Sequence, residues 1–180
     1  MPQAFLPIPR FPPMLARTFQ VLPLAPLSLT LTVYAGAVAR QHPSLFRRMG
    51  DHQHARFVLD PTDLPFVICL EPKGGKPTVT ATRSGGDFDA RIAGPLAALL
   101  GLVNGAFDGD ALFFSRDLII EGDTAAALAL RNAVDDAELD LTGEFERISG
   151  PCAQPVRLLM GFIERKTGVC LSRPPEEVSW

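Results

Sequence analysis

The side chains that could do chemistry are few and are spread along the chain. His52 and His54 form a His-x-His pair, which can ligate zinc or iron, but no carboxylate or cysteine at matching spacing accompanies it. Two exposed histidines at the start of a strand are the other interpretation. Residues 73–76, Lys-Gly-Gly-Lys, resemble part of a phosphate-binding loop, yet the Walker spacing and the helix after it are missing. We therefore expect a turn there, and neither a metal nor a nucleotide site.

The three cysteines, Cys69, Cys152 and Cys170, indicate no metal site and no disulfide framework, because their spacing is wrong and their number is odd. Cys69 lies within the apolar run 66–70, where a thiol usually behaves as a small core residue. This use of cysteine is typical of a reducing, cytoplasmic setting.

The signatures of common enzymes are absent: there is no Gly-x-Ser-x-Gly elbow, no dinucleotide fingerprint and no convincing Cys/His pair. General acid–base catalysis needs a titratable group in a partly dry pocket, and the apolar segments carry almost none. The carboxylate-rich turn at 108–110, beside Phe113 and Phe114, could form the lip of an active site, although a solvated loop next to the core is the commoner use. We predict no enzyme, no catalytic residue and no cofactor. A small hydrolase or isomerase acting on lipid is the remaining enzymatic alternative.

Composition indicates one globular domain with a surplus of apolar residues. Of 180 residues, 47% are hydrophobic and 21% are charged, and the mean hydropathy of +0.16 is high for a soluble protein. That surplus must be buried in a core, in a ligand cavity or against a membrane. The net charge of −3 argues against nucleic acid as the main partner.

Charge is distributed unevenly between the two halves. Residues 1–56 hold six arginines against one acid, a balance of +5, whereas residues 108–147 hold eleven acids against three arginines, a balance of −8. We expect the two parts to face different surroundings. A basic, apolar N-terminal segment suits an anionic bilayer surface, and scattered solvated arginines are the alternative.

The N-terminal region is predicted to be an irregular arm followed by a helix. Residues 1–13 contain five prolines, and residues 18–39 form a stretch of 22 without charge. Such a stretch is long enough for a transmembrane helix, and Ala37-Val38-Ala39 resembles a signal cleavage site. Because prolines interrupt the stretch, we expect a buried or membrane-docking helix over residues 27–40. A short helix over residues 43–49 follows, closed by Gly50.

Four strands are expected next, at residues 54–60, 66–70, 78–83 and 87–92. The second is apolar on both faces and should be central in the sheet. The third and fourth are predicted to form a hairpin across residues 84–86, with Phe88, Ala90 and Ile92 facing inward.

Three more helices and a fifth strand complete the prediction. The helix that begins at Gly94-Pro95 has Leu96, Leu99, Leu100 and Val103 on one face, but it is apolar nearly all round, so both sides should be covered. Residues 118–120 form a strand, and Asp123 is the N-cap of a helix over residues 124–134. A last helix, from Pro155 to Gly168, follows an acidic loop.

One stretch also carries a resemblance. Residues 109–136, GDALFFSRDLIIEGDTAAALALRNAVDD, resemble the signature of the sterol carrier protein type 2-like (SCP2) lipid-binding domain, in the bacterial branch of ubiquinone-biosynthesis accessory factors. Residues 57–66 and 92–100 fit the same family, so the resemblance covers roughly residues 45–137.

The resemblance and the element pattern imply the same α+β fold. The expected architecture is a mainly antiparallel sheet of about five strands, covered by helices and enclosing an apolar cavity. We divide the chain into a Pro-rich arm with apolar helices (1–44), an SCP2-like lipid-binding core (45–137), and an acidic loop with a C-terminal helix and tail (138–180), all in one structural domain.

The function implied by the resemblance is non-enzymatic lipid binding in oxygen-independent, anaerobic ubiquinone biosynthesis, with the polyprenyl tail of a quinone intermediate held in the cavity. The implied ligand is such an isoprenoid lipid or a phospholipid, and the implied partners are ubiquinone-biosynthesis enzymes, with peripheral contact to the inner membrane. The alternative is a scaffold that docks enzymes or the membrane through an apolar surface.

Large apolar residues that flank the family-like segments are the candidates for contact with lipid, and for each of them tight core packing is the alternative. They are Phe66, Ile68, Leu96, Leu99, Leu100, Phe113, Phe114, Leu118, Ile120, Leu130, Met160 and Phe162.

Overall fold

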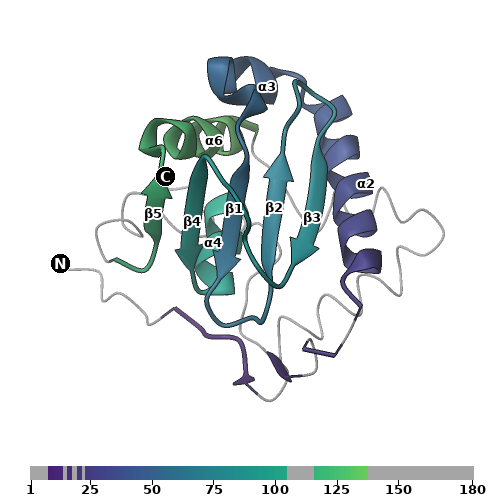
Figure 1. The fold of residues 1–180 in the computed structure, drawn as a ribbon. Helices are drawn as coiled ribbons and strands as arrows, with labels where there is room; N and C mark the ends of the chain where they lie inside the picture. Colours follow the sequence, from purple (N-terminus) through teal and green to yellow (C-terminus); the bar gives the residue numbers. More distant parts are fainter. Residues whose placement is uncertain (1–7, 14–15, 18–19, 22, 105–115, 138–180) are drawn as a thin grey trace, which may run out of the picture.

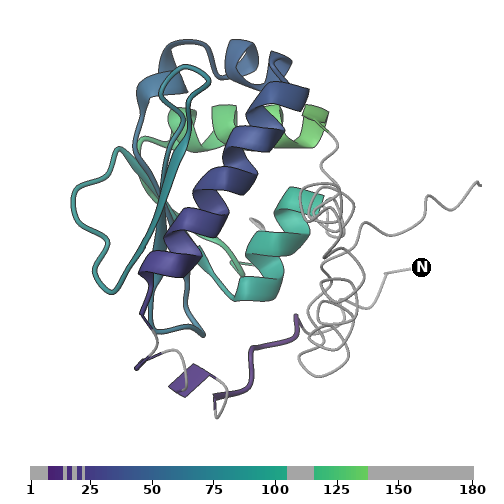
Figure 2. The ribbon, with the colours of Figure 1, turned by 90° about the vertical axis from the view of Figure 1, so that its right-hand side faces the viewer.

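The computed structural model describes residues 8–13, 16–17, 20–21, 23–104 and 116–137. These residues form one sheet with helices on one of its faces, which is the expected α+β arrangement (Figures 1 and 2). Three predicted features lie outside the described residues: the turn at 108–110, the apolar residues 111–114 that follow it, and the helix from Pro155 to Gly168.

The sheet has five strands, as predicted, and is mostly antiparallel. They are β1 (Phe57–Pro61), β2 (Val67–Glu71), β3 (Thr78–Thr82), β4 (Ala90–Gly94) and β5 (Ile119–Gly122). Their order is β3-β2-β1-β4-β5, and only β1 and β4 run parallel within the sheet. The apolar strand β2 is paired on both sides, in agreement with its sequence.

The predicted hairpin between the third and fourth strands is wrong. β3 lies at the edge and pairs only with β2, whereas β4 pairs with β1 and β5. The connecting residues 83–89 cross the helix-free face instead, where the carbonyl oxygen of Gly85 lies 3.6 Å from the sulfur of Cys69. Ala90 and Ile92 are buried as expected, but Phe88, on the crossing loop, is 38% exposed. The alternation of apolar and polar residues correctly predicted the inward side chains of β4, Ala90 and Ile92. It did not predict which strands are neighbours in the sheet.

The helices are α2 (Ala25–Gln41), α3 (Ser44–Met49), α4 (Leu96–Asn104) and α6 (Thr124–Ala137), with a 3-10 turn, η1 (Gly50–His54), after α3. In Figure 2, α2, α4 and α6 lie on the same side of the sheet, and α3 lies at one end of it. None of the helices within the described ranges has the length and hydropathy needed to span a bilayer.

α2 begins and ends close to its predicted bounds, 27–40. Pro26 lies in the first turn, where its missing N–H leaves no hydrogen bond unmade. The helix runs beside β3 at the edge of the sheet (Figure 1). Residues 37–39, which resemble a cleavage site, are buried in its last turns.

The predicted orientation of α4 is only partly right: Leu99 is buried as expected, but other residues of the predicted inner face are not. Ala97, Ala98 and Leu102 are buried, whereas Leu96 and Leu100, which were expected to face inward, are only partly buried. Since this helix is apolar nearly all round, hydrophobic periodicity could not select a face. The small alanines allow close approach, and this favours the observed side.

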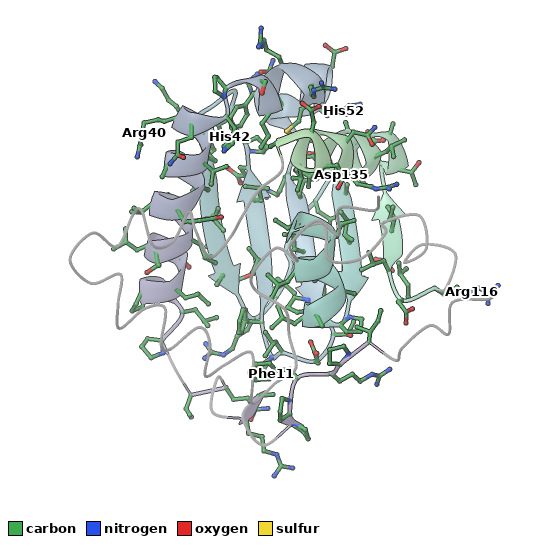
Figure 3. All side chains as sticks on the ribbon, turned by 180° about the vertical axis from the view of Figure 1, so that it is seen from behind. Phe11, Arg40, His42, His52, Arg116 and Asp135 are labelled. Carbon is green, nitrogen blue, oxygen red and sulfur yellow. The ribbon has the colours of Figure 1, made fainter. Side chains whose placement is uncertain are left out.

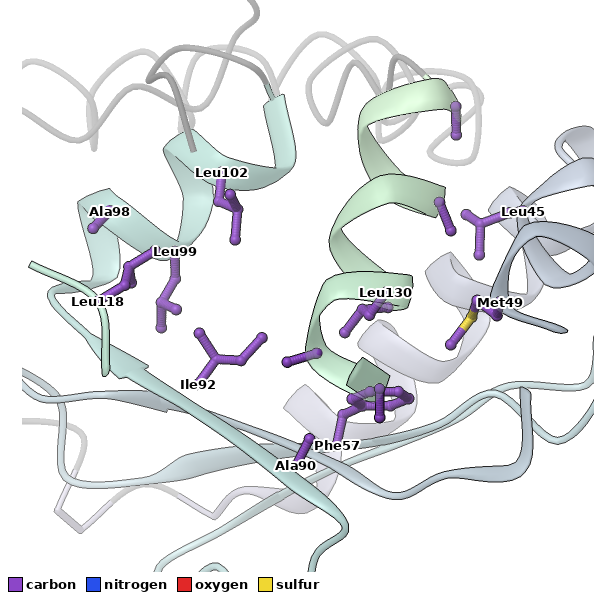
Figure 4. Packing of buried hydrophobic residues seen from close by; sticks show 14 of the residues in the cluster. Leu45, Met49, Phe57, Ala90, Ile92, Ala98, Leu99, Leu102, Leu118 and Leu130 are labelled. Atoms are coloured by element: carbon purple, nitrogen blue, oxygen red, sulfur yellow. The ribbon is translucent and has the colours of Figure 1, made fainter. Parts of the chain in front are cut away.

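The core lies between the helices and the inner face of the sheet (Figure 4). Phe57 of β1 and Ala90 of β4 are register partners, and both are fully buried. Met49 at the end of α3 and Leu130 of α6 belong to the same cluster. The N-terminal helices α2 and α3 therefore share one core with α6.

Candidate functional site

The candidate site is an apolar cavity between α2 and the sheet, with a volume of about 220 Å³. Seventeen of the residues that the structure describes line it, and among these seventeen Tyr34 alone has a polar side chain. They are Leu31, Tyr34, Ala35, Val38, Ala39, Leu45, Phe46, Met49, Leu59, Ile68, Leu70, Pro72, Pro77, Val79, Val103, Leu130 and Val134.

Two kinds of secondary structure provide its facing walls. On α2, residues 31, 34, 35 and 38 recur at helical spacing and present one stripe to the cavity. On the sheet, Leu59 and Ile68 are register partners, and Leu70 and Val79 form the next pair on the same face. α6 contributes Leu130 and Val134, which are four residues apart and therefore lie on one side of that helix.

The start of α6 is fixed by the predicted cap. The Asp123 carboxylate accepts hydrogen bonds from the backbone N–H groups of Ala125 (2.9 Å) and Ala126 (3.1 Å). These two hydrogen bonds fix the first turn of α6. The helix continues from there to the cavity residues Leu130 and Val134.

The structure brings two of the predicted lining residues, Ile68 and Leu130, to the cavity wall. Leu99 and Leu118 are buried in the core cluster, and Ile120 packs against that cluster. The remaining described candidates lie elsewhere: Leu96 and Leu100 are partly buried on α4, and Phe66 lines a separate hollow on the other face of the sheet.

Four candidates, Phe113, Phe114, Met160 and Phe162, lie outside the described residues. Whether any of the twelve candidates contacts lipid stays a prediction.

Sequence reasoning missed most of the cavity, above all the contribution of α2. The spacing of Leu31, Tyr34, Ala35 and Val38 is a detectable helical pattern within the uncharged segment, and it could have identified this wall. The part played by Val79 could not be inferred, because it depends on β3 being the edge strand beside α2.

The helix-free face of the sheet carries paired charges. Arg91 forms ion pairs with Asp60 and Glu121. The hydrogen bonds that its guanidinium donates, first to Asp60 and then to Glu121, raise the pKa of Arg91 above its usual value. Glu71 accepts hydrogen bonds from Lys73 and Arg56, which lower the pKa of its carboxyl group. These groups neutralise each other, so we interpret them as structural.

The histidine pair and the acids form no metal site in the part of the chain that the structure describes, where no group of three or more His, Cys, Asp or Glu side chains is close enough to hold an ion. His54 is exposed, and Nδ1 of the partly buried His52 lies 3.7 Å from a carboxylate oxygen of Asp123. None of the seventeen described lining residues of the cavity has a carboxylate, an imidazole or a thiol.

An α+β domain with an apolar, helix-covered cavity defines the class of this protein: it has the architecture of a small carrier of hydrophobic ligands. The model of the SCP-2 sterol transfer family matches residues 37–135. Since this match spans more than half of the chain, the protein belongs to that family, and the resemblance found in the sequence is confirmed.

The chain is similar to several solved structures, and the first of these has a TM-score that shows the same fold. "UbiJ-SCP2 Ubiquinone synthesis protein" is 18% identical, with a TM-score of 0.55 over 66% of this chain and 98% of that chain. A crystal structure of sterol carrier protein 2 is 16% identical, with a TM-score of 0.45 over 59% of this chain and 95% of that one. Sterol carrier protein 2 from Yarrowia lipolytica in its apo form is also 16% identical, with a TM-score of 0.45 over 62% and 92%. A search of curated protein sequences found no match.

Proposed function

We propose that the protein is a non-enzymatic lipid-binding accessory factor of oxygen-independent ubiquinone biosynthesis, which holds the polyprenyl tail of quinone intermediates in the cavity beneath α2. The observation that carries the proposal is the cavity wall, in which sixteen of seventeen side chains are apolar. Membership of a sterol transfer family supports a lipid ligand. The pathway is supported by the sequence resemblance and by the name of one structural relative.

An apolar wall favours a hydrocarbon chain and disfavours a polar head group. Each buried methylene contributes about 0.8 kcal/mol, whereas burial of an unpaired polar group costs roughly 1–3 kcal/mol in proteins. A chain would therefore lie inside with its ring outside, where modifying enzymes can reach the ring. Such a carrier needs no catalytic group and no cofactor of its own.

A substitution that fills the cavity tests the proposal. Ala35 lines the cavity, whereas Val33 on the same helix is 50% exposed. We expect Ala35→Phe to weaken uptake of a long-chain isoprenoid quinone at least tenfold, because the aromatic ring occupies the space of the chain. Val33→Phe should bind as the parent protein does. Equal affinities for parent and Ala35→Phe, measured by fluorescence titration, would contradict the assigned site.

A second role, contact with a membrane, is favoured by the outer face of α2. Leu29 is 67% exposed and lies one turn from Val33, and the exposed Arg40 lies near the C-terminal end of the same helix. We infer that this face binds an anionic bilayer through apolar insertion and basic charge. Vesicles containing phosphatidylglycerol should sediment the protein more strongly than vesicles of phosphatidylcholine alone.

Two serine variants separate this surface from general hydrophobicity. Leu29→Ser should weaken vesicle binding, whereas Leu128→Ser, at a 49% exposed position on α6, should not. Equal loss in both variants would exclude a specific role of α2.

If the protein is instead a scaffold, it should still recruit biosynthetic enzymes from cells that lack quinone precursors.

A further inference from the structure

We propose that α2 is the moving wall of the cavity, which turns about His42 and is held closed by the hydroxyl groups of Ser28 and Thr32 on the edge of β3. The proposal rests on the proposed function only for the identity of the molecule that enters. Ser28 and Thr32 are not among the residues that line the cavity. By holding α2 closed, they nevertheless control how fast a ligand enters and leaves.

Burial is concentrated at one end of α2. Residues 37–39 are buried, and none of residues 25–36 is. The buried end leads directly into α3, where Leu45 and Met49 are part of the core cluster. The helix is therefore anchored in the core at its C-terminal end, whereas the side chains of its N-terminal two thirds are half-buried or exposed.

The junction after α2 has the features of a hinge. His42 leaves the helical conformation, with φ −120° and ψ 65°, and Pro43, which has no backbone N–H, follows it. His42 and Arg40 lie at one end of the molecule, and Phe11, ahead of α2 in the chain, lies at the other (Figure 3). Rotation at His42 would therefore move the N-terminal end of α2 furthest.

The less buried part of α2 is attached to the sheet by hydroxyl groups. Thr32 Oγ1 donates to the carbonyl oxygen of Val79 (2.8 Å) and accepts from its N–H (3.0 Å). Ser28 Oγ accepts from the N–H of Ala81 (2.9 Å). Residues i and i+4 of a helix are about 6 Å apart along its axis, close to the roughly 6.7 Å between alternate strand residues, so the two rows match.

These bonds satisfy the outward backbone groups of an edge strand, which otherwise remain open to other chains. Water can replace a hydroxyl on a strand edge at small net cost, whereas it cannot replace an apolar contact. Separation of α2 from β3 would expose Val79 and the cavity behind it, since Leu31, Tyr34 and Ala35 of α2 form that wall. The sheet and α6 would stay in place.

Thiol labelling tests this opening in lipid-free protein. A Val79→Cys reporter, in a protein whose three native cysteines are replaced by serine, reports access to the cavity. A Val58→Cys reporter, fully buried on the opposite face of the sheet, reports global unfolding. We expect Thr32→Val to accelerate labelling of Val79→Cys by Ellman's reagent roughly tenfold, because one strand N–H loses its partner. Labelling of Val58→Cys should stay unchanged.

Two further variants serve as controls. Thr32→Ser keeps the hydroxyl and should label as slowly as the parent. Thr30→Val removes an exposed hydroxyl of the same helix, which donates to the carbonyl oxygen of Pro26 in that helix (2.9 Å), and should also stay slow. Should Thr32→Val fail to fold, Ser28→Ala decides, with acceleration expected again.

The proposal is overturned if removal of the Thr32 hydroxyl leaves labelling of Val79→Cys unchanged. It is also overturned if Thr30→Val accelerates that labelling equally, or if Val58→Cys accelerates in parallel. Because no lipid is present, the experiment is independent of the proposed function. Faster labelling in a protein that takes up no lipid would reject that function and retain the hinge.

Discussion

Asp123 connects the start of α6 to the sheet through hydrogen bonds. Its carboxylate caps α6, and its backbone N–H donates to the carbonyl oxygen of Asp89 (2.7 Å), just before β4. Asp63 has a similar double role, since its two carboxylate oxygens accept from Phe11 N (2.8 Å) and Leu96 N (2.9 Å). Asp123 and Asp63 therefore both connect separate segments through hydrogen bonds from backbone N–H groups.

Replacement of the cap should lower stability without changing the cavity. We expect Asp123→Ala to reduce the free energy of unfolding by about 1 kcal/mol, because two N–H groups of α6 lose their acceptor. Asp123→Asn keeps an acceptor oxygen and should lose much less. Urea denaturation measures both, and an equal loss in the two variants would show that the charge matters more than the cap.

Glu71 predicts a pH dependence. Hydrogen bonds from Lys73 and Arg56 lower its pKa in the folded protein below the ordinary value of 4.5. The stabilisation is therefore complete above the unfolded pKa and is lost as the pH falls through the lower folded pKa. The free energy of unfolding should decrease more steeply below about pH 4.5 in the parent than in Glu71→Gln. Parallel curves in acid denaturation would contradict the assignment.

At the scale of elements, the sequence predicted those whose ends carry specific signals. Asp123 marks the start of α6, Pro26 lies in the first turn of α2, and Gly50, with a φ of 54°, follows α3. The pairing of β4 was not predictable, because residues 83–89 contain turn residues that suit a hairpin as well as a crossing loop. The face of α4 was not predictable either, since its exposed and buried sides are equally apolar.

The contact between β4 and β5 depends on Gly122. Its φ is 80°, and an added Cβ would collide with the backbone carbonyl of Asp89. Gly86 has a similar φ of 61° but open space around it. We expect Gly122→Ala to lower the melting temperature clearly more than Gly86→Ala. Both substitutions force an alanine into a positive φ, but only the Cβ at position 122 also collides with a backbone carbonyl group. Similar shifts by differential scanning calorimetry would contradict this packing.

For the whole molecule, the two oppositely charged parts of the chain prove to be neighbours. Arg48 of the basic N-terminal region forms an ion pair with Asp136 at the end of α6 (2.5 Å). The expectation that the two parts face entirely different surroundings is therefore wrong for this pair. Among the described residues of this region, the exposed Arg10, Arg17, Arg40 and Arg47 are the basic groups left for an anionic surface.

The class of site could also be predicted only in part. An apolar surplus and the resemblance predicted a hydrophobic cavity, and the structure contains one. Of the predicted residues that the structure describes, Ile68 and Leu130 line it. The prediction placed the ligand near the family-like segments. Leu59, Leu130 and Val134 of these segments do line the cavity. The rest of its wall depends on the contact of α2 with the sheet, a long-range arrangement that follows from strand order.

The most direct test of the account is the content of the purified protein. Organic solvent extraction followed by mass spectrometry should release a lipid with a long isoprenoid or acyl chain, close to one molecule per chain and depleted in Ala35→Phe. Protein that releases no lipid, and that takes up neither isoprenoid quinones nor phospholipids when they are added, would contradict it.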